Sequence, residues 1–291
     1  MAIFESTRGL IEETEKSGLP IWEYVLKTSC EESNISEEQS WEMMGKTFDA
    51  MLESYRSYDQ FQVSASGLVG GDAEKMRVAR NSGDTICGSF IGSVIATALT
   101  VSECNACMHR IVAAPTAGSC GVLPAVLLPY AHVKDLSRDD LIKALYVASG
   151  FGAVIAQRAS ISGAEAGCQA EIGSASAMAA AALVYLHGGD LRMMENSVAM
   201  ALKNMMGLVC DPVAGLVEVP CVKRNVAGAM NALASAEMAL AGIESRIPAD
   251  EVIDTMKVVG SMLPPSLRET GEGGIAASPT AHRLFPDGPK I

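Results

Sequence analysis

The sequence is organised around a central stretch that begins Cys168-Gln-Ala-Glu-Ile-Gly173 and ends Gly207-Leu-Val-Cys210-Asp-Pro-Val-Ala-Gly215-Leu-Val-Glu-Val-Pro-Cys221. Its three cysteines stand beside Gly, Asp and Pro, the residues at which a chain turns. Thiolates at turns suit a soft metal centre, and three of them would leave one position of an iron–sulfur cluster open for a substrate. The stretch therefore predicts an iron–sulfur lyase. Zinc with a fourth ligand from elsewhere is the alternative that this spacing leaves open.

The Ala- and Met-rich run between these cysteines predicts a fold of closely packed helices. Apolar residues make up 49% of the 291-residue chain and aromatic residues only 5%, so Ala, Val, Leu, Ile and Met form the core. Ala and Met favour helices over strands, and no long segment alternates with period two. We expect an all-α fold with cluster-binding loops. Residues 1–60 form an N-terminal helical hairpin, and residues 61–291 form the catalytic domain.

Individual helices are predicted from apolar spacing together with capping and stop signals. Ser36 and Gln39 form a capping box at one helix start, and Pro20 and the Asn34 region separate the first two helices. The predicted helices span residues 7–16, 36–55, 85–108, 137 to about 149, 174–186, 191–206, 225–241 and 249–262.

The charge pattern excludes several classes of partner. The net charge is −12 without a Lys/Arg-rich block, whereas nucleic-acid binding requires a basic surface. The N-terminus has no basic segment followed by an apolar one, so no signal peptide is predicted. The least charged stretches, residues 85–102 and 111–131, are diluted by small residues or proline and are better explained as buried helices than as membrane spans. We expect a cytoplasmic protein that binds neither nucleic acid nor membrane.

The other cysteines are interpreted as structural. Eight cysteines in a cytosolic chain do not indicate a disulfide framework. Cys30 and Cys87 are expected to be small buried hydrophobes. Cys104 and Cys107 form a C-x-x-C pair, but no second pair or His cluster completes a zinc site. Cys120 is a possible fourth thiolate.

A Gly/Ser/Thr turn before an apolar helix is the candidate carboxylate-binding site. It reads Ala113-Ala-Pro-Thr116-Ala-Gly118-Ser119-Cys-Gly121. Free N–H groups at a helix N-terminus attract anions, so Thr116 and Ser119 could hold an α-carboxylate there. A tight interhelical turn without a ligand is the alternative.

These features suit the β-elimination of water from a small hydroxy acid. Hydroxide is a poor leaving group, and an open iron acting as a Lewis acid can take it. A base must also remove the α-proton. Ser162 and Glu165, in the polar loop before Cys168, are candidates for catalysis, although no residue identifies the base. His109 and His187 are poor candidates, since His187 ends a predicted helix and would stabilise that terminus.

Several long motifs resemble the iron–sulfur-dependent L-serine dehydratases. The motifs are Ala114-Pro-Thr-Ala-Gly-Ser-Cys-Gly-Val-Leu-Pro-Ala-Val126, Ser162-Gly-Ala-Glu-Ala-Gly-Cys-Gln169, the stretch 207–221 and Arg268-Glu-Thr-Gly-Glu-Gly-Gly274. The resemblance implies an all-helical domain that binds an oxygen-sensitive [4Fe–4S] cluster and converts L-serine to pyruvate and ammonia without pyridoxal phosphate.

The same resemblance assigns roles to individual residues. The cluster ligands would be Cys168, Cys210 and Cys221, and Cys120 would not be a ligand. Apart from the resemblance, we expect Thr116, Gly118, Ser119 and Arg268 to bind the substrate. The serine hydroxyl would meet the open iron. A lyase acting on L-cysteine or another small amino acid, or a structural subunit that binds zinc or a cluster, are the alternatives.

The resemblance is to the alpha subunit of the two-chain form. Single-chain members carry a regulatory domain before the catalytic one, so a beta subunit and an oligomer are expected here. Single-chain members can also end in a cysteine that reaches the cluster, whereas this sequence ends Phe285-Pro-Asp-Gly-Pro-Lys-Ile291. Ala117 and Asn204 stand where many relatives have Asn and His, so neither is given a catalytic role.

Overall fold

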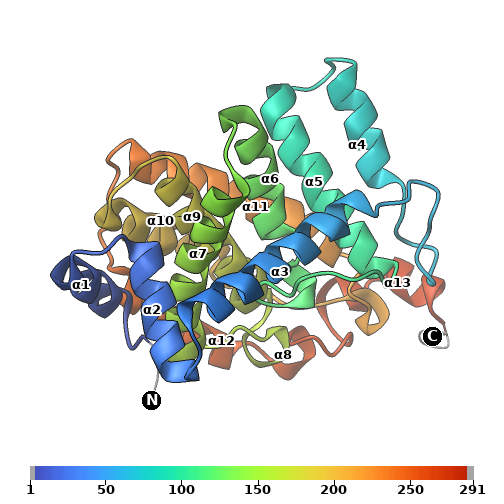
Figure 1. Cartoon of the computed structure of the whole chain (residues 1–291). Coiled ribbons are helices and arrows are strands. Elements are labelled where there is room, and N and C mark those ends of the chain that lie inside the picture. Colours follow the sequence, from blue (N-terminus) through green and yellow to red (C-terminus); the bar gives the residue numbers. More distant parts are fainter. Residues whose placement is uncertain (1–3, 287–291) are drawn as a thin grey trace.

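A computed structural model describes residues 4–286, and these residues form a helical bundle (Figure 1). The predicted all-α fold is confirmed: the described part of the chain has no β-strand and one isolated β-bridge. No helix among residues 4–286 is long and apolar enough to cross a membrane. The α-helices are α1 (Thr7–Ser17), α2 (Ile21–Ser33), α3 (Glu37–Arg56), α4 (Asp72–Asn81), α5 (Gly88–Ala106), α6 (Val122–Lys134), α7 (Arg138–Arg158), α8 (Gly163–Ala166), α9 (Ser174–Leu186), α10 (Leu191–Met205), α11 (Cys221–Leu240), α12 (Ala249–Met262) and α13 (Pro279–Leu284).

Shorter turns of helix connect them. The 3₁₀ turns are η1 (Ala117–Ser119), η3 (Val213–Gly215), η4 (Pro265–Leu267) and η5 (Gly274–Ala277), and η2 (Gln169–Gly173) is a π-helical turn.

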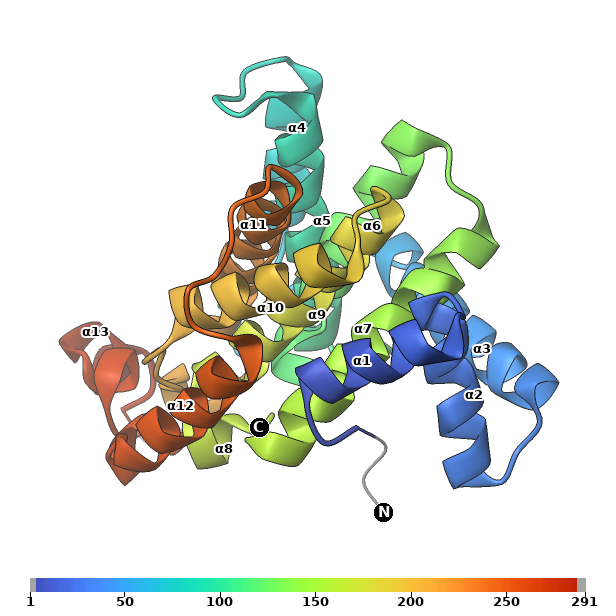
Figure 2. The same cartoon turned by 90° about the vertical axis from the view of Figure 1, so that its left-hand side faces the viewer.

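Helix α9 is the centre of the bundle, as its Ala-rich sequence indicates. It packs against α6, α7, α10 and α11, and the residues from Ser174 to Val184 are all buried. Alanine side chains let neighbouring helices approach closely, so one helix can be covered on all sides. Figure 2 shows the helices around it, with α8 and α12 lying together at one end of the bundle. The cysteine-bearing segments meet near that end.

The N-terminal segment has three helices rather than the predicted two. Helix α2 occupies the interval between Pro20 and Asn34 that was expected to be a connection. Pro20 caps the start of α2, where its missing N–H costs nothing, and Asn34 ends the helix in the left-handed conformation. Leu10 and Val25 belong to the same core as α9, so this segment packs on the main body.

Two further helices differ from the sequence-based expectation: one was not predicted, and one is longer than expected. Helix α4 was not predicted, because its sequence is polar and only Ala73 is buried. Helix α7 continues to Arg158, whereas its end was expected near Ser149. The two glycines that follow the expected end serve close packing inside the helix. A Cβ atom at Gly150 would lie 2.7 Å from Val25 Cγ2, and one at Gly152 would lie 2.9 Å from the Met178 side chain.

Candidate metal centre

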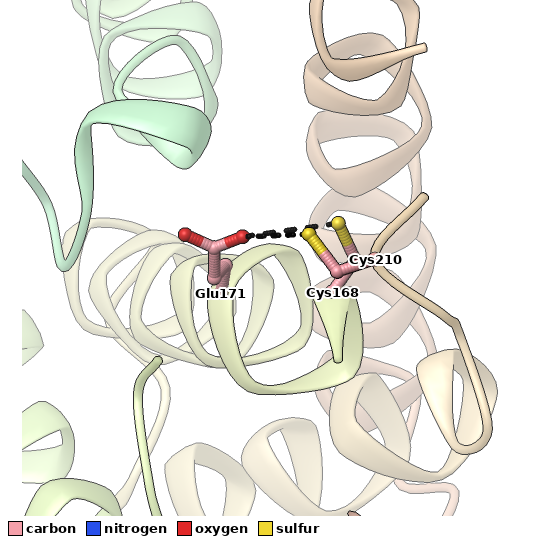
Figure 3. Close-up of side chains that lie close together, drawn as sticks. All are labelled: Cys168, Glu171 and Cys210. Atoms are coloured by element: carbon pink, nitrogen blue, oxygen red, sulfur yellow. Dashed lines mark hydrogen bonds between the residues drawn. The ribbon is translucent and has the colours of Figure 1, made fainter. Parts of the chain in front are cut away.

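Three buried side chains from two separate segments of the chain converge at one point (Figure 3). These are Cys168, Glu171 and Cys210, whose ligand atoms all lie within 4.8 Å of one another. The thiols of Cys168 and Cys210 donate to Oε2 of Glu171 at 3.8 and 3.7 Å. Two sulfurs and a carboxylate oxygen in this arrangement could hold a metal ion.

A short π-helical turn places Cys168 and Glu171. Cys168 caps η2, and Glu171 lies within it. Turns of this kind are frequent at functional sites. Gly167 precedes them with φ 77°, and a Cβ there would lie 2.7 Å from Leu263 Cδ1 and 2.8 Å from Leu208 O. The turn therefore requires glycine at position 167 for both conformation and space.

Cys210 is held by main-chain pairing with the C-terminal part of the chain. Its N–H donates to Leu267 O at 2.9 Å, and its carbonyl accepts from Glu269 N–H at 2.7 Å. This pairing is the isolated bridge between Cys210 and Arg268. Gly163 leaves room for the thiol, since a Cβ there would lie 3.0 Å from Cys210 Sγ.

Cys221 is the first residue of α11 and is buried beside this group, but not within it. The sequence placed it in a loop, four residues before the predicted helix start at 225; the structure corrects this, because α11 begins directly after Pro220. Burial raises the pKa of the Cys221 thiol to about 12, and the nearby charges of Cys168 and Glu171 add to the effect. The third predicted cluster thiol therefore lies within electrostatic range of the first.

Arg224 supplies positive charge to the group. It lies one turn after Cys221 in α11, and its Nη1 donates to Cys168 Sγ at 3.5 Å and to Val209 O at 2.9 Å. Its Nη2 forms a buried ion pair with Asp211 Oδ1 at 2.8 Å. Burial alone would lower the pKa of Arg224, but Cys168 and Asp211 raise it above its usual value. Arg224 thus stays charged beside the sulfur of Cys168.

Asn225 connects the Thr116 turn to Cys221. Its Oδ1 accepts from Gly121 N–H at 2.9 Å, and its Nδ2 donates to Gly118 O at 2.7 Å and to Cys221 O at 3.0 Å. The side chain is almost completely buried. The candidate carboxylate-binding turn and the third cysteine are therefore fixed relative to each other.

The predicted substrate-binding residues of this turn differ in how far they are exposed to a ligand. The Ser119 hydroxyl is fully buried and donates within the turn, to Ala114 O or Thr116 O. Thr116 and Gly118 are half-buried. A Cβ at Gly118 would lie 3.3 Å from Oε1 of Glu171, so the turn borders the metal-binding group.

Glu171 has an altered affinity for protons. Burial raises the pKa of its carboxyl group, and the charge of Glu269 acts in the same direction. Hydrogen bonds from Thr116, Cys210 and Cys168 oppose this shift. The carboxyl group therefore lies where a negative charge is costly unless a cation accompanies it.

The remaining predicted site residues lie around the group rather than in it. Ser162 is half-buried at the start of α8, and Glu165 is exposed and accepts from Ser160 Oγ at 2.6 Å. The guanidinium of Arg268 donates to the carbonyl oxygens of Ser261, at 2.7 Å, and Leu263, which ends α12. Arg268 therefore contacts the site only through its main chain, which pairs with Cys210.

Sequence reasoning did not single out Glu171 or Arg224. A spacing signal was present for both: Glu171 stands three residues after Cys168, and Arg224 three after Cys221. Residues three apart share one face of a helix. The spacing becomes informative only once both pairs are known to lie on helical turns, at η2 and at the start of α11.

Among residues 4–286, the other cysteines do not form a comparable centre. Cys30 is buried as expected, but Cys87 is exposed at the connection of α4 and α5, so its predicted burial was wrong. A cavity of about 390 Å³ lies between α1 and α10. Its lining includes Arg8 and Glu12, which form an ion pair with each other at 2.7 Å.

Comparisons with known proteins show which proteins this chain is similar to. The family model described as "Serine dehydratase alpha chain" matches residues 16–276. The chain is 45% identical over 282 residues to the "Probable L-serine dehydratase, alpha chain" of Bacillus subtilis, covering 97% of this chain and 94% of that protein. It is 40% identical over 286 residues to the "L-serine dehydratase, alpha chain" of Peptoniphilus asaccharolyticus, covering 98% of each. A "Probable L-serine dehydratase, alpha chain" of Latilactobacillus sakei is 58% identical over 190 residues, or 65% of this chain and 91% of that protein.

Proposed function

The chain belongs to the serine dehydratase alpha chain family, and on this premise we propose that it dehydrates L-serine to yield pyruvate and ammonia. We propose further that Cys168, Cys210 and Cys221 hold a [4Fe–4S] cluster. The observation that carries this proposal is the convergence of buried thiols and Glu171 from separate segments. Residues 61–291 would form the catalytic domain.

The donor set fits such a cluster. All eight cysteines are free thiols, and the three proposed ligands are buried from water. Cysteine thiolates are the usual ligands of iron–sulfur clusters. Arg224 offsets part of the negative charge that three thiolates would bring into the protein interior. Free thiols also agree with work in the cytoplasm, where cysteines remain reduced.

The residues around the cluster would position the substrate. The cluster, when bound, supplies Lewis acidity toward the departing hydroxyl group. Thr116 and Gly118 stand half-buried beside Glu171, and we propose that they bind the serine carboxylate. Asn225 holds that turn against α11 and so fixes it relative to Cys221, a residue that would hold the cluster. Ser119 supports the turn from within, and Arg268 remains a predicted substrate contact.

A beta subunit is the proposed partner, because the similar proteins are alpha chains by name. We propose that the two chains assemble into an oligomer, and that the partner completes the site. The base that removes the α-proton is not assigned to a residue of this chain; Ser162 and Glu165 remain the candidates.

The test is an anaerobic reconstitution with iron and sulfide, with and without the beta subunit. Pyruvate release from L-serine and the iron and sulfide contents are measured in the same sample. Pyruvate formation that follows cluster content supports the proposal. A full cluster with activity on L-cysteine instead would identify a related lyase. Bound zinc without acid-labile sulfide would contradict the cluster and favour a structural metal site.

A further inference from the structure

We propose that Gln169 is a positioning residue of the metal centre: its side chain sets the place of Cys168 relative to the segment that carries Cys210. This inference rests on the proposed function, because both cysteines are proposed cluster ligands. Gln169 acts through the chain segments that bear these ligands, and it is not itself proposed to touch the metal or the substrate.

Gln169 is a buried amide directly beside a proposed ligand. It follows Cys168 and is the first residue of the π-helical turn η2. The residue is 0% exposed, so the polar atoms of its amide must find their partners inside the protein. Those partners therefore show which segments the side chain joins.

The first support is a pair of hydrogen bonds to the segment before Cys210. Oε1 of Gln169 accepts from Gly207 N–H at 2.8 Å. The main-chain N–H of Gln169 donates to Leu208 O at 2.9 Å. One residue thus holds the turn of Cys168 against the segment that leads to Cys210, through both its side chain and its main chain.

The second support is the use of the amide nitrogen. Nε2 of Gln169 donates to Ala166 O at 2.9 Å, at the end of α8, and to Met256 O at 3.2 Å, within α12. The carbonyl groups at a helix end have no partner within the helix, so Ala166 O needs such a donor. A Cβ at Gly260 would lie 3.3 Å from Nε2, and glycine therefore lets α12 approach closely here. Gln169 joins η2, α8, α12 and the segment 207–208.

The third support is that the partners require an amide. Two carbonyl oxygens need donors and one N–H group needs an acceptor, and a glutamine side chain supplies all three. Glutamate has nearly the same shape, but an ionised carboxylate has no proton to donate and would place an oxygen against the two carbonyl oxygens. Replacing the amide by a carboxylate therefore breaks the connection with little change of shape.

The two cysteines depend on this connection to different degrees. The N–H and carbonyl of Cys210 both pair with the segment around Arg268, which holds Cys210 in place by itself. Arg224 reaches Cys168, but it contacts the sulfur and not the main chain. Loss of the Gln169 amide is therefore expected to shift Cys168 relative to Cys210, while Cys210 keeps its main-chain partners.

The experiment compares full-length wild type, Gln169→Glu and Gln169→Asn, with Asn231→Asp as the matched control. The amide of Asn231 has the same pattern of bonds. Its Nδ2 donates to Ser176 Oγ at 2.7 Å and to Ala201 O at 2.9 Å, and its Oδ1 accepts from Asn204 Nδ2 at 2.7 Å. None of these partners is a proposed ligand or stands next to one in the sequence.

Two measurements follow the metal centre, and two follow the fold. The cluster-free chain is titrated anaerobically with Co²⁺, whose visible absorption changes when thiolates bind it. One ion is a suitable probe, because the ligand atoms of Cys168, Glu171 and Cys210 lie within 4.8 Å of one another. After reconstitution with iron and sulfide, iron release to a chelator is timed. Circular dichroism and urea denaturation compare the fold and stability of all four proteins.

Three results are expected. Gln169→Glu binds Co²⁺ about 10-fold more weakly than wild type and releases iron about 10-fold faster, the size of effect seen when a residue that orients a metal ligand is changed. Gln169→Asn keeps the amide on a shorter side chain and lies between the two. Asn231→Asp matches wild type in Co²⁺ binding and iron release, even where its stability falls as far as that of Gln169→Glu.

Equal Co²⁺ affinity and iron release in wild type and Gln169→Glu would overturn the inference while leaving the proposed function intact. An equal loss in Asn231→Asp would do the same, because the effect would then follow general destabilisation. If neither Gln169 variant folds, the amide is structural and the inference also fails. Wild type that takes up neither iron nor sulfide would instead overturn the proposed cluster, whatever the variants show.

Discussion

Glu103 and Glu171 are both buried glutamates with cysteine neighbours, yet their carboxylates are used differently. Glu103 is 1% exposed. Its Oε1 accepts from the N–H groups of Asp72 and Ala73 at 3.0 and 3.1 Å, and its Oε2 accepts from the Tyr58 hydroxyl at 2.8 Å. These donors hold the start of α4 against α5. Each donor keeps its proton whatever binds nearby, so Glu103 needs no further ligand.

Glu171 has donors of another kind. The thiols of Cys168 and Cys210 can donate to it only while no metal is bound. Cys104 and Cys107, next to Glu103, come from one helix end, whereas Cys168 and Cys210 come from separate segments. The comparison teaches that burial and composition do not separate a structural carboxylate from a candidate ligand. The chemistry of the hydrogen-bond donors does.

The largest expected difference between the two regions is in metal uptake. Cys210→Ala removes one of the converging sulfurs, and we expect cluster content and pyruvate release to fall by about 100-fold or more. Mutating a residue that only supports a metal ligand costs up to about 100-fold, so removing a ligand itself should cost at least as much. Cys107→Ala, at the half-buried partner of Cys104, should leave both unchanged. Iron and sulfide analysis after anaerobic reconstitution measures the effect. Loss of iron in Cys107→Ala would place a metal in the second region.

The next difference is in stability of the metal-free chain. Glu103→Ala leaves three donors without their acceptor, and we expect the free energy of unfolding to fall by about 3 kcal/mol. Glu171→Gln should change it by less than about 1 kcal/mol, because the costly buried charge is removed along with its bonds. Urea denaturation followed by circular dichroism compares them. Equal losses in the two variants would mean that both carboxylates are structural.

Arg224 should show a smaller effect, confined to the thiol-rich region. Arg224→Lys keeps the charge but cannot reach Cys168, Val209 and Asp211 at once. We expect the cluster to be lost about 10-fold faster in air, judged by decay of its visible absorption. The control is Arg158→Lys, which replaces an arginine paired with Asp254 on the surface. A matching acceleration in that control would show that the effect is not specific to the site.

The smallest expected effect is a pH dependence in the Glu103 region. Burial and Glu103 raise the pKa of Tyr58 above its usual value. A raised pKa in the folded state means that its contribution to stability is complete below about pH 10 and is lost as pH rises further. Tyr58→Phe should therefore cost about 1 kcal/mol at pH 8 and less at pH 10.5. Urea denaturation at both pH values tests this, and a constant difference would contradict it.

Local signals in the sequence predicted the helices well where caps were explicit. The capping box at Ser36 and Gln39 is present, and α12 has its predicted bounds. Helix α2 was missed because Pro20 was interpreted as a separator, whereas proline also starts helices. The end of α7 was missed because Gly150 and Gly152 serve contacts with side chains far away in the sequence.

The candidate site was predictable only in part for the same reason. Cys168, Cys210 and Cys221 were singled out because each stands at a turn, and motif resemblance related them to one family. Glu171 and Arg224 were not singled out, because their role at the site depends on which side chains they contact in the folded protein. A three-residue spacing places side chains on one face of a helix, but not against any particular partner.

The sequence by itself determined the all-α class, the central alanine-rich helix and the family, since periodicity, caps and long motifs are local properties of the chain. Tertiary structure alone decided that Glu171 faces two thiols while Glu103 caps α4. Both glutamates lie within three residues of a cysteine in the sequence. Their difference arises from which distant donors folding brings to each carboxylate, and no local pattern encodes that choice.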